Sequence, residues 1–368
     1  MTIEFIIFIS IFFYVLIYLF VLLKISPDAF KNLNGKNNSL DKLLHFSIIV
    51  AAKNEEGNIS TLISSLKKLN YPEDNYEVII VDDYSNDNTF HLAKKLTNGL
   101  ENFTVISAIN KKYEDKRGAL DYGISLATYP NIAITDADCM PETDWLLCLS
   151  PKFNAGCDFA FGIAPFYQTN KLVNKVSCYE NFRNSLLAIS AANFGVAYTA
   201  SARNFGFKKD AFEIIGGYKN TTETISGDDD LLLREAVKKG LKVCTLTSPG
   251  SYVYSETKKT FREYFSQRAR HTQSSFHYPF KQKLFLSLWH LMNLVFIFSP
   301  AFIFINKIFI LPFLIKILFD TAAVLTHQRK FGYRFLIFEI IYLQMIYEIF
   351  LIVHFIKAKF GKIEWKQP

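Results

Sequence analysis

Two carboxylates with a single residue between them, Asp136 and Asp138, follow a short apolar run over residues 132–135, and Pro141 is expected to close the turn. Alternate residues of an extended chain point the same way, so both carboxylates can face one pocket. Neighbouring carboxylates repel each other unless a cation neutralises them, and hard oxygen ligands suit Mg²⁺ or Mn²⁺, which substrate phosphates commonly complete. The alternative is a solvated turn, because an Asp-x-Asp pair alone is a weak signal.

The residues around this pair predict alternating strands and helices. Continuous apolar runs typical of buried strands cover residues 46–52, 77–81, 103–107 and 132–135, and helical spacing covers residues 59–69, 88–96 and 118–127. Alternation at this spacing predicts a mostly parallel sheet with right-handed crossovers. Less regular strands are expected at residues 159–164, 198–208 and 241–246, and helices at residues 172–189 and 229–239.

Such a sheet binds ligands at the carboxyl ends of its strands. Asp82 and Asp83 end the second predicted strand, so we expect them on a strand end adjacent to that of Asp136 and Asp138. Their carboxylates can accept hydrogen bonds from a uracil N–H or from ribose hydroxyls. The alternative for residues 82–89 is a helix N-cap, because Ser, Asn and Asp dominate that position.

The chain of 368 residues is half hydrophobic, and the apolar residues concentrate at its two ends. Residues 3–23 are almost wholly apolar and long enough for one membrane-spanning helix. Lys24, Lys31, Lys36 and Lys42 follow, which places the next region on the cytoplasmic side by the positive-inside rule. A signal peptide is the alternative, but no basic start or small-residue cleavage site is evident. Three further candidate spans cover residues 284–304, 308–325 and 335–355.

The topology of the C-terminal region stays open. Four spans would leave the tail outside, but the tail is basic, which favours the inside. Its lysines are Lys357, Lys359, Lys362 and Lys366. The last candidate span also contains Glu339 and Glu348, which are costly in lipid. One C-terminal segment is therefore a candidate for an interfacial or re-entrant helix.

The formal charge is +7, and the five cysteines form no C-x-x-C pair. A basic excess can indicate nucleic acid, but here it lies beside apolar segments, so membrane lipids are the expected partner and nucleic acid is not. Basic and aromatic residues interleave over residues 258–283, which is typical of an amphipathic helix at a membrane surface. An odd number of cysteines without metal spacing favours a reducing cytosol, with neither a disulfide framework nor a zinc site.

Four stretches, in the expected order, resemble family 2 glycosyltransferases, the inverting, nucleotide-sugar-dependent class with a GT-A fold. They are residues 48–57 (IIVAAKNEEG), 81–89 (VDDYSNDNT), 135–138 (TDAD) and 227–231 (GDDDL). Residues 116–120 (KRGAL) are similar to the family's K-x-x-AL signature. The resemblance covers about residues 45–275, and several ordered motifs are more specific than any one of them.

The resemblance implies a nucleotide-sugar site. Its donor-binding residues would be Glu55, Asp82, Asp83, Lys116 and Asp136. Asp82 and Asp83 would hold the nucleoside, and Asp136 would contact the donor near its ribose or sugar. Asp138 would ligate a Mg²⁺ or Mn²⁺ ion on the diphosphate.

The resemblance also implies that Asp229 is the general base that deprotonates the acceptor hydroxyl. Asp228 stands where the family usually has Glu, so the base assignment could shift by one residue. Breaking the sugar–phosphate bond builds negative charge that a metal ion neutralises, while a nearby carboxylate removes the acceptor proton. The alternative is a helix N-terminus that three acidic residues stabilise.

Gln267 and Arg270 resemble the Q-x-x-R-W motif of membrane-bound, often processive members, in which these residues contact the diphosphate and the acceptor. His271 replaces the Trp, and imidazole stacks less well on a sugar ring, so this departure weakens the case for a processive enzyme. The alternative is a basic face on lipid headgroups.

Residues 203–206 resemble a segment on the acceptor side, which makes Asn204 a candidate acceptor contact.

These features predict a multi-pass, metal-dependent hexosyltransferase of cell-envelope glycan biosynthesis in the inner membrane. Its cytoplasmic catalytic domain would transfer a sugar from a nucleotide-diphosphate donor, expected to be UDP-linked, to a hydroxyl of a lipid-linked or glycan acceptor. The alternatives are a processive polysaccharide synthase, a non-catalytic membrane-anchored sugar-nucleotide-binding protein and a structural docking platform. The expected domains are an anchor (1–24), a linker (25–45), a GT-A domain (46–257), an amphipathic interface segment (258–283), transmembrane or interfacial helices (284–356) and a basic tail (357–368).

Overall fold

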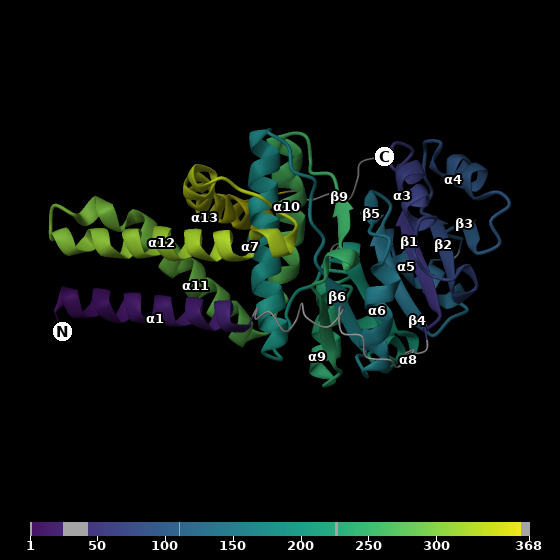
Figure 1. Ribbon diagram of the computed structural model, residues 1–368, viewed down its shortest axis with the longest axis horizontal. Coiled ribbons are helices and arrows are strands. Elements are labelled where there is room, and N and C mark those ends of the chain that lie inside the picture. The colour runs from purple at the N-terminus through teal and green to yellow at the C-terminus, as the bar shows by residue number, and fades with distance from the viewer. Residues whose placement is uncertain (1, 25–42, 110, 225–226, 362–368) are drawn as a thin grey trace. The chain divides into compact units, whose positions relative to one another are not determined.

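The computed structural model describes residues 2–24, 43–109, 111–224 and 227–361 (Figure 1). Two units are each compact by themselves. The sheet unit lies within residues 30–167 and 191–256, and the helical unit lies within residues 1–29, 168–190 and 257–363. Residues 168–190, from inside the domain predicted at 46–257, therefore pack with the helical unit, and the predicted domain boundaries stay predictions.

The four predicted apolar runs form one half of a seven-stranded sheet. They are β1 (Phe46–Ala52), β2 (Tyr76–Asp82), β3 (Phe103–Ser107) and β4 (Asn131–Asp136). These strands are parallel, and the sheet has the order β3-β2-β1-β4-β7-β6-β8 (Figure 1). Their nearly continuous burial agrees with the apolar runs, because a parallel sheet covered on both faces hides both sides of each strand. The prediction of a mostly parallel sheet is confirmed.

The second half of the sheet is less regular. Strand β7 (Phe205–Lys208) runs antiparallel to β4 and to β6 (Phe159–Gly162), and β8 (Val243–Leu246) pairs in parallel with β6 at the edge. The strand predicted at residues 198–208 is thus restricted to its last four residues, because a 3₁₀ turn over Ala202–Asn204 precedes it.

A separate two-stranded ribbon joins β5 (Cys139–Pro141) to β9 (Val253–Ser255). Pro141 therefore lies within a strand and pairs with Val253, whereas we expected it to close a turn. Strands of three residues are too short for an alternating pattern to predict.

Helices cover this sheet and place parts of the site. The helices that follow the first strands are α3 (Ile59–Leu66), α4 (Thr89–Thr97), α5 (Asp115–Leu126) and α6 (Trp145–Asn154). Helix α5 lies close against the sheet at Gly123, where a Cβ would be 2.7 Å from the Ile49 Cγ2 and 3.0 Å from the Val81 Cγ2. Glycine therefore permits an approach that brings the start of α5 to the carboxyl ends of β1 and β2.

Cys157 and Cys244 form a disulfide, so the expectation that the cysteines form none is wrong. Cys157 precedes β6 and Cys244 lies on β8, and the pairing of these strands brings the two Cα atoms to 6.0 Å. The cysteines are 87 residues apart, so their spacing gave no signal. The other cysteines, Cys139, Cys148 and Cys178, are buried free thiols.

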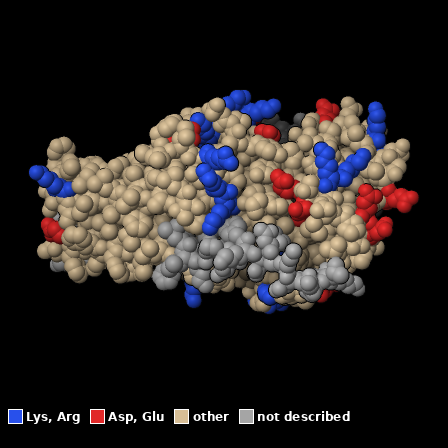
Figure 2. All heavy atoms as spheres, viewed as in Figure 1, with Lys and Arg blue, Asp and Glu red and all other residues tan. Residues whose placement is uncertain are grey.

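Among its described residues, the helical unit contains three helices that are long and apolar enough to cross a membrane. The unit is built from α1 (Ile3–Lys24), α7 (Leu172–Asn193, whose last turn belongs to the sheet unit), α10 (Phe261–Ser275), α11 (Phe280–Phe298), α12 (Ile310–His327) and α13 (Ile337–Phe360). The three candidate spans cover Phe280–Phe302, Lys307–Phe331 and Ile337–Phe360. In α1 the apolar stretch among the described residues is Glu4–Leu19, which is shorter, so the predicted N-terminal anchor stays a prediction. On the face in Figure 2, large areas over these helices carry few charged side chains.

Buried charges of the helical unit are paired, as burial requires. Arg183 on α7 lies 2.8 Å from the Asp320 Oδ1 on α12, and Lys316 also contacts Asp320. Glu348 on α13 lies 3.4 Å from the His290 Nδ1. Glu348, one of the two carboxylates that we expected to be costly in lipid, thus has a polar partner inside the helical unit.

Candidate active site

The site lies at the carboxyl ends of β2, β1 and β4. Ala51 on β1 pairs with Asp136 on β4, and Ala52 on β1 pairs with Asp82 on β2. Strand β1 therefore separates the two acidic motifs, which we had expected on adjacent strands. Two interstrand spacings put them about 10 Å apart.

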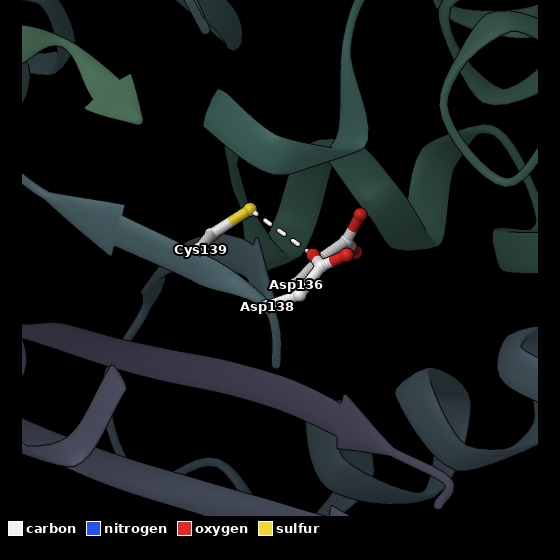
Figure 3. A group of neighbouring side chains, drawn as sticks. All are labelled: Asp136, Asp138 and Cys139. Atoms are coloured by element: carbon white, nitrogen blue, oxygen red, sulfur yellow. Dashed lines mark hydrogen bonds between the residues drawn. The ribbon is translucent and has the colours of Figure 1, made fainter. Parts of the chain in front are cut away.

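Asp136 at the end of β4, Asp138 in the turn that follows and Cys139 at the start of β5 form a compact cluster (Figure 3). Their ligand atoms lie within 4.8 Å of one another. The Cys139 thiol donates a hydrogen bond of 3.6 Å to the Asp138 Oδ1, and burial, followed by the charges of Asp138 and Asp136, raises its pKa well above the ordinary value. The thiol therefore stays protonated, and two carboxylates remain as hard oxygen donors, which fits Mg²⁺ or Mn²⁺.

Lys116, in the first turn of α5, links two acidic motifs that are distant in the sequence. Its Nζ lies 2.8 Å from the Asp136 Oδ1 and 2.7 Å from the Asp228 Oδ2. Burial lowers the pKa of Lys116, but the two carboxylates outweigh it and the pKa is well above its ordinary value. Burial likewise raises the pKa of Asp228, but Lys116 outweighs it and the pKa is lowered. One ammonium and two carboxylates thus form a charged group at the site.

Local backbone geometry places Lys116. Asp115 has φ = +55°, in the left-handed region that is uncommon for residues other than glycine. A Cβ at Gly118 would lie 1.8 Å from the Tyr113 carbonyl oxygen, so only glycine fits there. Gly118 stands inside the KRGAL stretch but was not among the predicted site residues.

Asp229 and Asp230 hold a neighbouring loop at the N-terminus of α9 (Asp230–Lys238). The Asp229 carboxylate accepts hydrogen bonds of 2.7 Å from the backbone N–H groups of Asp230 and Ala202. The Asp230 Oδ1 accepts from the Thr199 Oγ1 at 2.6 Å and from the Ala200 N–H at 3.0 Å. Asp229 is therefore the N-cap of α9, which agrees with the helix-terminus alternative and leaves its base role open.

The pKa of Asp229 is shifted in the direction that suits a base. Burial raises this pKa well above its ordinary value, and the charges of Asp230 and Asp228 raise it further. A carboxylate with a raised pKa holds an accepted proton more strongly.

Asp82 and Asp83 end β2 on the other side of β1. The Asp82 Oδ2 accepts a hydrogen bond of 3.2 Å from the Ser85 N–H, while its buried Oδ1 has no hydrogen-bond partner among the described residues. Asp83 forms an ion pair with Lys111, and Lys53 Nζ lies 4.0 Å away. The free Asp82 oxygen is thus available to a ligand N–H or hydroxyl.

Glu55 has local partners. Its Oε2 accepts a hydrogen bond of 2.6 Å from the Asn58 Nδ2, and its N–H donates to the Thr89 Oγ1 at 2.7 Å. Thr89 in turn donates to Asp87 from its N–H at 3.0 Å. These hydrogen bonds tie the loops after β1 and β2 together. The N-cap of α4 is Asn88, whose side chain makes no cap hydrogen bond, so the N-cap alternative for residues 82–89 does not explain these contacts.

Asn204 lies in the core of the sheet unit. Its side chain is fully buried, accepts a hydrogen bond of 2.9 Å from the Trp145 Nε1 and donates to the carbonyl oxygens of Ile163 and Ser251 at 2.9 and 2.8 Å. Its amide therefore holds the core of the sheet unit together, and it has no group left for an acceptor.

Gln267 and Arg270 lie on α10, in the helical unit, and their predicted contacts stay predictions.

The fold, together with a site at the carboxyl ends of β2, β1 and β4, is that of a GT-A domain. A solved mannosyltransferase from Pyrobaculum calidifontis, in complex with GDP-Man and Mn²⁺, has the same fold, with a TM-score of 0.63, 17% identity, and coverage of 97% of this chain and 96% of that chain. Residues 47–216 match the model of glycosyl transferase family 2. This part of the chain therefore belongs to the family.

Two curated relatives extend the comparison. Glycosyltransferase AglE of Haloferax volcanii is 27% identical over 195 residues, which are 53% of this chain and 62% of that protein, so this match spans less than two thirds of the relative. The second relative, from Methanococcus voltae, is 25% identical over 304 residues, which are 77% of this chain and 88% of that protein. Its name describes a transferase of a diacetamido-dideoxy-glucuronosyl group to dolichyl N-acetylglucosaminyl phosphate.

Proposed function

We propose that this chain is a membrane-bound inverting glycosyltransferase. It transfers a sugar from a nucleotide-diphosphate donor to a hydroxyl of a lipid-linked or glycan acceptor at the cytoplasmic face. The observation that carries the proposal is Lys116, whose ammonium group reaches both Asp136 and Asp228 and so joins a donor motif to an acceptor motif. Neither a binding module nor a docking platform requires these two motifs to meet.

The spacing of the site fits a nucleoside diphosphate. The free Asp82 oxygen and the Asp136–Asp138 pair are separated by β1, about 10 Å by two strand spacings. A nucleoside held at Asp82 would leave its diphosphate near Asp136 and Asp138. UDP is the expected nucleotide, since a carboxylate can accept from the uracil N–H, and GDP is the alternative that the Pyrobaculum neighbour raises.

Asp138 and Asp136 would hold a Mg²⁺ or Mn²⁺ ion. When bound, the ion neutralises the charge that develops on the leaving diphosphate. Lys116 holds Asp136 in place and adds a positive charge to the same region. The chain's own residues thus orient the diphosphate and oppose its charge.

Asp229 takes the acceptor proton. The acceptor oxygen attacks the anomeric carbon, its O–H bond breaks toward the Asp229 carboxylate, and the sugar–phosphate bond breaks with its electron pair going to the nucleoside diphosphate. The two backbone N–H groups that bond to Asp229 fix its carboxylate for this transfer. Asp228 pairs with Lys116 and is the positioning residue.

An acceptor in the membrane agrees with the three apolar helices. The Methanococcus relative, by its name, acts on a dolichyl-linked sugar, which supports a lipid-linked acceptor. A processive polysaccharide synthase is the alternative product class, and Gln267 and Arg270 would then contact the growing chain.

Incorporation of label from a panel of UDP- and GDP-sugars into membranes containing the full chain tests the proposal. Wild type would be run with and without Mn²⁺, beside Asp138→Ala and the exposed control Asp210→Ala. We expect a metal-dependent, organic-soluble product of one or two sugars with wild type and Asp210→Ala, and its loss with Asp138→Ala. A long water-soluble polymer would instead indicate the processive synthase. Equal incorporation by Asp138→Ala would contradict the assigned site.

Calorimetry separates the non-catalytic alternatives. A binding protein would take UDP with Mn²⁺ but would release no sugar from its donor, whereas a docking platform would bind neither. We expect metal-dependent binding together with slow donor hydrolysis, and hydrolysis lost in Asp229→Asn.

A further inference from the structure

Helix α13 has an inverted distribution of side chains. Its buried face carries Glu339, Gln344, Glu348 and His354, all at most 5% exposed. Its opposite face is apolar and exposed, with Phe338, Ile341, Ile349, Ile352, Ile356 and Phe360. A helix of this kind turns its polar side to protein and its apolar side to lipid.

The first half of α13 packs along α7. The Glu339 Oε1 lies 2.5 Å from the Lys175 Nζ, and the Tyr347 hydroxyl donates to the Asn184 Oδ1 at 3.2 Å. These contacts follow α7 over ten residues, from Lys175 to Asn184, in the same order along both helices.

The second half of α13 packs along α10. Phe350 contacts the ring of Phe265 with centroids 4.8 Å apart, and the Lys357 Nζ donates to the Ser266 Oγ at 2.9 Å. Farther along, the Gln273 Nε2 donates to the Ala358 carbonyl oxygen at 3.4 Å. The contacts therefore continue almost to the last residue of α13.

Helix α10 cannot lie in hydrocarbon. Its 15 residues include Arg262, Glu263, Arg268 and Arg270. Charged residues are costly at the bilayer centre, and the Arg268 Nε lies 2.8 Å from the buried carboxylate of Glu180. The half of α13 that packs along α10 therefore shares the depth of α10, at the level of the headgroups.

We propose that α13 lies in the plane of the membrane interface, with its apolar face in one leaflet, and does not cross the bilayer. Helices α11 and α12 then form a single outward and return passage. The chain after α13 then stays on the side of the membrane where α10 lies. Residues 256–260 join the sheet unit to α10, and five residues are too few to cross the bilayer. The partner of the exposed apolar face is the acyl layer beneath the headgroups of that leaflet.

Charge supports this placement. Lys357 and Lys359 lie in the last turn of α13, and Lys362 and Lys366 follow in the sequence. A basic end beside an in-plane helix can contact anionic headgroups. The conflict between four spans and a basic tail disappears, because the tail now lies on the same side as the sheet unit.

Cysteine labelling in sealed vesicles tests the side of the C-terminus. A cysteine added after Pro368 would be compared with Lys68→Cys, exposed on the sheet unit, and Ile305→Cys, 70% exposed between α11 and α12. The native free thiols are buried, so the wild type is the blank. An impermeant maleimide should label the added cysteine in the same vesicle orientation as Lys68→Cys. Ile305→Cys should be labelled in vesicles of the opposite orientation. The proposal would be overturned if the added cysteine were labelled in the same vesicle orientation as Ile305→Cys, or if all three cysteines were labelled in one orientation.

The depth of spin labels tests the in-plane orientation. Ile341→Cys and Ile356→Cys lie 15 residues apart, about 22 Å along a helix. Leu311→Cys and Leu325→Cys on α12, about 21 Å apart, are the matched pair on a crossing helix. The α13 pair should show nearly equal depth and the α12 pair should not. A depth difference in α13 equal to that in α12 would mean that α13 crosses.

Discussion

The ammonium group of Lys116 lies between carboxylates that come from two distant parts of the chain. Asp136 ends a central strand, and Asp228 precedes α9, so neither could hold the other without a cation between them. Lys116 is only 13% exposed, and its charge therefore acts in a region of reduced dielectric. The ion pairs of Lys116 therefore hold Asp136 and Asp228 close together before any donor binds.

Replacement of Lys116 should remove most of the activity. We expect Lys116→Gln to reduce the rate of sugar transfer about 100-fold or more, because a preorganised charge at the diphosphate is lost. Lys112→Gln, an exposed lysine in the same segment, should leave the rate unchanged. The measurement is initial-rate label incorporation at saturating donor, and equal rates for the two variants would contradict the assigned role.

The pH profile distinguishes the two candidate bases. The pKa of Asp229 is raised and the pKa of Asp228 is lowered. A base works only when deprotonated, so with Asp229 the activity should fall, as pH falls, at a pH above the ordinary carboxyl value of about 3.9. Because the charge of Asp230 helps to raise this pKa, Asp230→Asn should move the acid limb of kcat to lower pH. An acid limb that does not move, or moves upward, would count against Asp229.

At the scale of elements, glycines decide where the catalytic side chains stand. Gly118 leaves room for the Tyr113 carbonyl, and Gly123 lets α5 approach β1 and β2. The start of α5 is thereby fixed at the end of the sheet, with Lys116 in its first turn.

A methyl group at position 118 should displace that turn. We expect Gly118→Ala to destabilise the sheet unit by about 1–3 kcal/mol through overpacking and to lower activity in parallel. Gly57→Ala is the matched control, since a Cβ there meets nothing within 4 Å. Thermal unfolding in detergent measures the effect, and similar Tm values for the two variants would show that the close contact is not restrictive.

The elements that could be predicted from the sequence are those with long, regular patterns. Strands β1 to β4 and helices α3 to α5 follow from apolar runs and helical spacing, and the acidic ends of β2 and β4 follow from turn chemistry. The ribbon of β5 and β9, and the link from Lys116 to Asp228, depend on contacts between distant residues. Asn204 was misassigned because a buried amide and a ligand-binding amide look the same in a sequence.

At the scale of the whole molecule, the disulfide bears on the predicted orientation. The lysines after residue 23 favour a cytoplasmic sheet unit, whereas a Cys157–Cys244 bond is expected in an oxidising compartment. A sheet unit in a reducing cytosol would instead carry the two cysteines as thiols.

Thiol titration checks this bond. Protein denatured without reductant, after alkylation at lysis, should contain three free thiols, and reduction should release two more to give five. Cys157→Ser should then contain four thiols without reduction, since its partner is freed. Five thiols without reductant would mean that the chain carries no disulfide.

The rate of sugar transfer in Asp229→Asn, beside wild type and Asp74→Asn in the same membranes, tests the central claim most directly. Asp74 is an exposed aspartate away from the strand ends of the site, so its substitution controls for expression and charge. We predict that Asp229→Asn lowers the rate by about 10²–10⁴-fold, the usual contribution of a general base, while Asp74→Asn keeps the wild-type rate. A wild-type rate in Asp229→Asn would contradict transfer at this site.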